Sequence, residues 1–195
     1  MLAMLAFAGA PAATASAQAP SAPANTGGAA YGVIPAKPAA AQDPVAPAPP
    51  PVPGAEAVLG LDGSAQPPAD APLEVQEASA AANQISGLPY RYGGGHRLPW
   101  KLDRGYDCSG TVSCALHGGD LLKRPLDSSR FLRWAQAGPG QWITVYTRSS
   151  HAFVVIAGLR LDTSAAGDAS GLKGPRWRPS LRSTRGFRAR HPVGF

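Results

Sequence analysis

The feature that most constrains the fold of this chain is an abrupt change of composition near residue 72. Between residues 18 and 72, 13 Pro and 16 Ala fill 29 of 55 positions, with one Tyr and almost no other large apolar side chains. Such a segment cannot bury enough surface to offset its ordering entropy. We therefore predict a disordered linker over 18–72. The folded domain is predicted over 73–195, which holds all four Trp and is long enough for one core.

Residues 1–17 have the pattern of the later part of a secretory signal. A short apolar run is followed by Ala15-Ser-Ala17, which fits a small-x-small cleavage site, although no basic segment precedes the run. The run is too short to span a membrane. A signal peptide, and hence export, is predicted. The alternative is an alanine-rich tail without a targeting role.

The stretch Arg104-Gly-Tyr-Asp-Cys-Ser-Gly110 has the pattern of a helix start around a cysteine. Asp107 is a favourable N-cap, and apolar residues recur at helical spacing over 112–116. Cys108 would then lie in the first turn, where free backbone N–H groups and the helix dipole favour the thiolate. The pattern indicates a nucleophile, although a small buried cysteine at a helix start would show the same residues. Cys114 lies six residues further along the helix, so no intrachain disulfide is expected.

Two more helices are predicted, one on each side of the Cys108 helix. The first begins near residue 73 and ends before Gly87. Its apolar stripe consists of Val75, Ala78, Ala82 and Ile85. The other begins after a capping Asp127-Ser-Ser129 and ends at Gly138-Pro-Gly140. Its apolar residues are Phe131, Leu132 and Trp134.

The rest of the domain has the alternating pattern of β-strands. Strands are predicted over 141–147, 151–157 and 159–163, with short turns between them. Consecutive strands with short connections form an antiparallel sheet, so the predicted class is α+β.

The second of these strands opens with His151, which can supply the base that a cysteine nucleophile needs. With a two-residue turn at Ala157-Gly158, Asp162 lies diagonal to His151 on the same sheet face and can orient the imidazole. A three-residue turn would bring Thr163 to that face instead and leave Asp162 as a strand-end residue. The length of the turn decides between them.

Three motifs in this order resemble the NlpC-type cell-wall cysteine peptidases, a branch of the papain-like superfamily. They are Pro89-Tyr-Arg-Tyr-Gly-Gly94, Asp107-Cys-Ser-Gly110 and the strand-opening His151. The resemblance covers about residues 73–165. It implies an α+β, papain-like fold in which a helix-borne Cys packs on an antiparallel β-sheet. It also implies hydrolysis of an amide bond in peptidoglycan stem peptides, without a metal or other cofactor.

The resemblance also implies residue roles. Cys108 would be the nucleophile and His151 the base, while Asp162 is our choice for the third residue. The residues implied to line the pocket for the free amino end of the stem peptide are Tyr90, Asp107 and Ser109. The other histidines, predicted to be surface or structural residues, are His96, His117 and His191. No spacing among them and the acidic residues indicates a metal site.

Charge is distributed unevenly along the chain. Residues 73–195 hold 17 Lys and Arg against 8 Asp and Glu, and from Lys173 onward there are 7 basic residues and no acidic one. With an export signal, this basic C-terminal stretch is predicted to bind anionic wall polymers rather than nucleic acid. A solvated basic surface without a partner fits equally well. The expected location is the bacterial cell wall or the medium, with no transmembrane segment, and the expected state is a monomer.

Two functional classes fit the sequence. The first is a secreted cysteine peptidase, and the second is a catalytically weak or inactive relative that acts as a cell-wall binding module. The intact Cys108 and His151 favour the enzyme, because a binder needs no reactive pair. Phe153 on the catalytic face, and the long segment between Gly94 and Asp107, would favour the binder if they closed the groove.

Overall fold

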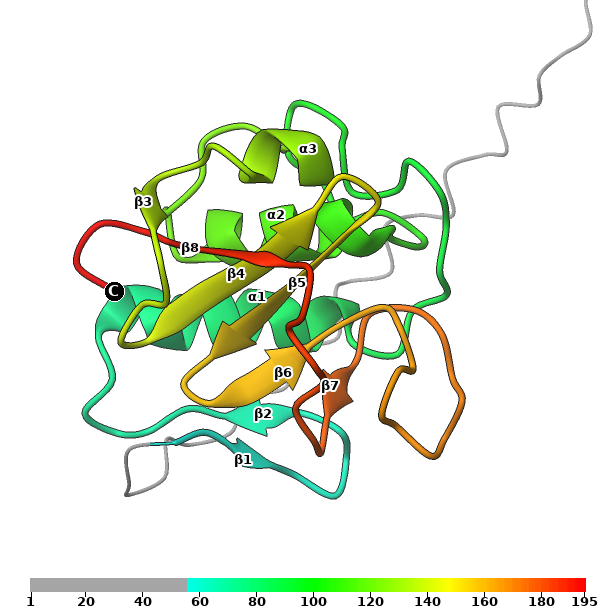
Figure 1. Ribbon diagram of the computed structural model, residues 1–195. Helices are drawn as coiled ribbons and strands as arrows, with labels where there is room; N and C mark the ends of the chain where they lie inside the picture. Colours follow the sequence, from blue (N-terminus) through cyan, green and yellow to red (C-terminus); the bar gives the residue numbers. More distant parts are fainter. Residues whose placement is uncertain (1–55) are drawn as a thin grey trace, which may run out of the picture. The chain divides into compact units, whose positions relative to one another are not determined.

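The computed structural model describes residues 56–195. The predicted signal peptide over 1–17, and the predicted linker as far as residue 55, lie outside the described residues. The described part contains three helices, a main antiparallel sheet and a small two-stranded sheet (Figure 1). The predicted α+β class, with the helix that bears Cys108 packed on an antiparallel sheet, is confirmed.

The main sheet has six strands in the order β3-β8-β4-β5-β6-β7, and every neighbouring pair is antiparallel. The strands are β3 (Gln136–Ala137), β4 (Ile143–Arg148), β5 (His151–Ile156), β6 (Leu159–Leu161), β7 (Trp177–Arg178) and β8 (Arg188–His191). The predicted strands correspond to β4, β5 and β6, with ends displaced by one or two residues. The strand β8 lies between β3 and β4, so the sheet does not follow the order of the chain.

Helices α1 (Leu73–Ile85) and α2 (Cys108–Gly118) pack against each other, and both contact β5 from one side of the sheet (Figure 1). The predicted bounds of α1 are confirmed, and the four apolar residues of its stripe are fully buried. On the facing strand, Ala152, Val154 and Ile156 contribute to the same core. This packing fixes the start of α2 against the start of β5.

Helix α3 (Ser128–Phe131) is shorter than predicted. Asp127 caps it as expected, and Phe131 is buried, but the helix ends before Leu132 and Trp134. After Phe131 the backbone continues in i→i+3 turns as far as Trp134. Ala135 then adopts a positive φ of 48°, and the next two residues pair with β8 as strand β3. Pairing with a distant strand outweighs the local helical pattern here.

The predicted boundary of the linker at residue 72 is wrong. Strands β1 (Val58–Leu59) and β2 (Ala65–Gln66) form a hairpin, and Ala65 is fully buried against the core. The Asn83 side chain of α1 holds this hairpin by bonding both backbone groups of Ala65, at 2.8 and 3.0 Å. The composition of the segment did not reveal it, because the groups that order it come from elsewhere in the chain.

The basic C-terminal stretch is part of the main sheet rather than an extension of it. Strand β7 pairs with β6 and strand β8 pairs with β4. Arg178 is fully buried, and the Arg182 side chain is only 15% exposed, so neither belongs to an open basic surface. Among residues 56–195, no helix has the length and apolar character that a membrane span requires.

Candidate active site

Cys108 is the first residue of α2, directly after the capping Asp107. The Asp107 carboxylate accepts a hydrogen bond of 2.7 Å from the Gly110 amide and so fixes the first turn. A Cβ atom on Gly110 would lie 2.0 Å from the Gly94 carbonyl oxygen, so only glycine lets the loop 93–96 approach the helix start. The glycines of the two motifs therefore bring this loop beside the cysteine.

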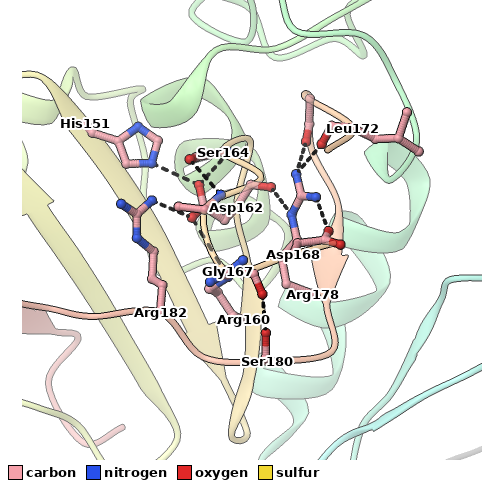
Figure 2. Close-up of polar contacts among 12 residues, drawn as sticks. His151, Arg160, Asp162, Ser164, Gly167, Asp168, Leu172, Arg178, Ser180 and Arg182 are labelled. Atoms are coloured by element: carbon pink, nitrogen blue, oxygen red, sulfur yellow. Dashed lines mark hydrogen bonds and ion pairs between the residues drawn. The ribbon is translucent and has the colours of Figure 1, made fainter. Parts of the chain in front are cut away.

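The turn between β5 and β6 has the two-residue length that brings Asp162 to His151. Ala157 and Gly158 both have positive φ, 45° and 79°, and Ile156 pairs with Leu159 across the turn. In this register Asp162 shares the sheet face of His151. Its Oδ1 lies 2.9 Å from Nε2 of the imidazole, and the two side chains point toward each other in Figure 2. This contact leaves Nδ1 for the cysteine side of the ring.

Cys108 and His151 alter each other's protonation. Burial alone would raise the pKa of the Cys108 thiol, but hydrogen bonds from the His151 imidazole and the Ala152 amide lower it overall. Burial would also lower the pKa of His151, but hydrogen bonds to Asp162 and Cys108 raise it to about 9. Near neutral pH these shifts favour a thiolate beside an imidazolium, the reactive form of a cysteine nucleophile.

Asp162 is held as a buried carboxylate, only 1% exposed. Burial would raise its pKa, but hydrogen bonds from His151 and the Ser164 amide, together with Arg182, hold the pKa below its usual range. Arg182 donates to Oδ2 at 3.1 Å, opposite the oxygen that faces the imidazole (Figure 2). Asp162 can therefore orient the imidazole and stabilise its positive charge.

A second buried arginine holds the loop that follows Asp162. The Arg178 guanidinium is fully buried and forms an ion pair with Asp168, and it also donates to the Asp162 and Leu172 carbonyls (Figure 2). These bonds tie β7 to both ends of the loop. The sequence predicted only a basic surface for Arg178, whereas the structure makes it a support of the segment that carries Asp162.

The segment after β7 covers the sheet face that carries His151. Phe187 packs edge-on against Phe153 at 5.2 Å between ring centroids, and the Arg182 guanidinium lies over both rings. Phe153 is 1% exposed because these groups and Tyr146 enclose it. It therefore lies beside His151 on the same sheet face, and it is not among the residues that line the cavity at Cys108.

A cavity of about 540 Å³ opens beside Cys108. Tyr90, Asp107 and Ser109, the three residues expected to form a pocket, all line it. Its other lining residues are Tyr92, Gly93, His96, Asp127, Ser128, Ser129, Ser149 and Ser150. The long segment between Gly94 and Asp107 does not fill this space.

His96 was predicted to be a surface or structural residue, but it lines this cavity. Its Nε2 lies 2.9 Å from Oδ1 of Asp107 and 3.3 Å from the Ser109 hydroxyl. The hydrogen bond to Asp107 raises the pKa of His96, and this effect outweighs the lowering by burial. A signal was present in the sequence, because His96 directly follows the glycines that contact the helix start. His117 instead stacks on Trp100, and His191 bonds Gly138 and Gln136, both away from the cavity.

Within residues 56–195 no group of three or more His, Cys, Asp or Glu side chains is placed to hold a metal ion. Cys108 and Cys114 are both free, in agreement with the sequence prediction.

No family model matches the chain, and no curated protein has a similar sequence. Among solved structures, the chain is similar to that of the peptidoglycan hydrolase RipB from Mycobacterium tuberculosis, with a TM-score of 0.46 and 20% sequence identity. The similarity covers 63% of this chain and 66% of that chain, so less than two thirds of RipB is matched. A similarity this distant does not indicate an activity for this chain.

We expect Cys108 to react selectively with an alkylating reagent. Its pKa is lowered, whereas burial raises the pKa of Cys114. At pH 6.5 to 7.5, limiting iodoacetamide should modify Cys108 about tenfold faster or more, as measured by peptide mass spectrometry of the native protein. His151→Ala should slow this reaction because the thiol loses its cationic partner. Equal or reversed labelling of the two cysteines would contradict the proposed thiolate.

Proposed function

We propose that this protein is a secreted cysteine peptidase that hydrolyses an amide bond in peptidoglycan stem peptides. The observation that carries the proposal is the arrangement of Cys108, His151 and Asp162. A thiol with a lowered pKa lies at a helix start beside an imidazole with a raised pKa, and a buried carboxylate holds the far side of that ring.

The proposed reaction uses these groups in turn. The Cys108 thiolate attacks the amide carbonyl carbon, and a tetrahedral intermediate forms. The Gly110 amide donates to Asp107, but the Cys108 and Ser109 amides have no carbonyl partner within the helix, so they are suited to stabilise the developing oxyanion. The His151 imidazolium gives its proton to the leaving amine as the C–N bond breaks. A water molecule, deprotonated by His151, then hydrolyses the thioester and regenerates the thiolate.

The choice of substrate rests on the resemblance of three motifs to the cell-wall peptidases, and the shape of the site is compatible with it. The cavity beside Cys108 is open to solvent and large enough for several residues of a peptide. Phe153 is buried beside His151 and does not line this cavity, so it does not close the cavity as an inactive binding module would require.

The proposal also includes binding of anionic wall polymers by the basic C-terminal stretch, although fewer of its residues are available than the sequence suggested. Lys173, Arg185 and Arg188 are exposed, so they can meet an anionic polymer. Arg178 and Arg182 are engaged by Asp168 and Asp162 and are not available for it.

The proposal is tested by the products of the reaction. Purified peptidoglycan is incubated with the full chain in excess chelator, and the soluble fragments are analysed by mass spectrometry. New amino termini within the stem peptide are expected, and their position identifies the bond. Release of intact stems from the sugar would instead indicate amidase chemistry. Intact stems of several types, with the protein still sedimenting with the wall, would favour the binding module.

A further inference from the structure

The Asp107 carboxylate lines the catalytic cavity but is already committed within the protein. Its Oδ1 accepts hydrogen bonds from His96 Nε2 at 2.9 Å and from the Ser109 hydroxyl at 3.2 Å. The same oxygen caps α2 through the Gly110 amide, and Oδ2 accepts from the Gly93 amide at 2.9 Å. Asp107 is only 7% exposed, and the ion pair with His96 offsets its charge.

The second carboxylate of the cavity, Asp127, is more exposed than Asp107, with 55% of its side chain accessible to solvent. Its Oδ1 accepts from the Arg130 amide at 2.8 Å, and its Oδ2 lies 3.4 Å from the Arg130 guanidinium. Asp107 is therefore not available as an uncompensated anion, whereas the charge of Asp127 is offset only by a solvent-exposed pair with Arg130.

His96, by contrast, presents a hydrogen-bond donor to the cavity. Its side chain is 26% exposed against 10% for that of Asp107, so a ligand in the cavity meets the imidazole first. Among the described residues nothing hydrogen-bonds its Nδ1, which remains free to donate when the ring is protonated. A donor of this kind binds a carbonyl or carboxylate oxygen, whereas the protonated ring has no acceptor for an ammonium group.

We propose that His96 makes this cavity selective for stem peptides whose amino end is acylated, with a carbonyl oxygen rather than an ammonium group beside the imidazole. A stem still joined to its sugar presents an amide carbonyl at this end, whereas a released stem presents an ammonium group. The proposal rests on the proposed function and replaces the expectation that Tyr90, Asp107 and Ser109 hold a free amino end. It makes wall-attached stems, rather than released ones, the substrate class.

The test separates binding from turnover. Two synthetic stem peptides are compared, identical except that the amino end is free in one and acetylated in the other. Their affinities are measured by calorimetry at pH 6.5 with the full chain carrying Cys108→Ala. The acetylated peptide is expected to bind about tenfold more tightly or better. Adding His96→Gln, which keeps a donor for Asp107 but removes the charge, should reduce the preference to about threefold or less. His117→Gln, outside the cavity, is the matched control and should leave the preference unchanged.

The outcomes distinguish this proposal from the proposed function. Equal or tighter binding of the free peptide, a preference that survives His96→Gln, or no binding of either peptide would overturn the role of His96. Turnover of the same peptides by the chain with Cys108 intact is scored separately. If the acetylated peptide binds preferentially but neither is cleaved, the peptidase proposal fails while the selectivity stands. If both are cleaved equally well and bind equally, the selectivity fails and the peptidase proposal stands.

Discussion

Replacing Cys108 by Ala is expected to reduce hydrolysis of a stem peptide by at least about 10⁴-fold, and His151→Ala should have an effect of similar size. The two side chains act as one unit, because the imidazolium stabilises the thiolate and later protonates the leaving amine. The double variant should therefore be little worse than either single variant. The measurement is kcat/KM with a soluble stem peptide, followed by mass spectrometry of the products.

Cys114→Ala provides the matched control for this experiment. Cys114 lies on the same helix and is also a free thiol, but it contacts the Tyr106 hydroxyl rather than His151. Its loss should leave kcat/KM within about twofold of the unaltered chain, because no reacting group touches it. Substantial activity in Cys108→Ala would exclude the thiol mechanism, whatever the behaviour of Cys114→Ala.

The second large effect is expected for Asp162→Asn, which should reduce kcat/KM by roughly 10² to 10⁴-fold. The amide keeps the size of the carboxylate but loses the charge that holds the imidazolium. Because the hydrogen bond to Asp162 contributes to the raised pKa of His151, about 9, the alkaline limb of the pH–rate profile should move to lower pH in the variant. If kcat/KM falls but the alkaline limb of the pH–rate profile does not move, Asp162 has a structural role and does not set the pKa of His151.

Asp162→Asn should also destabilise the fold, by about 3 kcal/mol, since Arg182 and Arg160 would remain buried beside a neutral group. The pKa of Asp162 is lower in the folded state, so the carboxylate stabilises the fold above its unfolded pKa. This contribution is lost as the pH falls through the folded pKa. The difference in free energy of unfolding between the two chains should therefore narrow in acid. Asp168→Asn, which removes the Arg178 ion pair without touching His151, is the control and should leave the pH–rate profile unmoved.

The elements that the sequence predicted well are those with local signals. The stripe of α1 repeats at helical spacing, Asp107 caps α2 with its own side chain, and the Ala157-Gly158 turn sets the register of its two strands. Each depends on residues within a few positions of one another. The spacing of these residues is therefore enough to predict α1, α2 and the strands β4 to β6, and the two-residue turn then brings Asp162 close to His151.

The features that the sequence did not reveal depend on distant partners. The 58–66 hairpin is held by Asn83 of α1, and β8 pairs with both β3 and β4 across a long loop. Two arginines of a stretch that looks like a solvated surface, Arg178 and Arg182, pair with acidic residues 10 and 20 positions earlier. Charge counts along the chain cannot separate an exposed arginine from one that supports a carboxylate.

Because β8 lies between β3 and β4, the sheet beside the site is completed only by residues that are synthesised late. The nucleophile, the base and Asp162 all precede residue 163, but Arg182 and Phe187, which hold Asp162 and cover the sheet face that carries His151, come about 20 residues later. A nascent chain from which this segment has not yet emerged lacks both β8 and the groups that cover the sheet face. Pairing over such sequence distances forms late in folding. The groups that hold Asp162 in place are thus completed only after most of the domain has been synthesised.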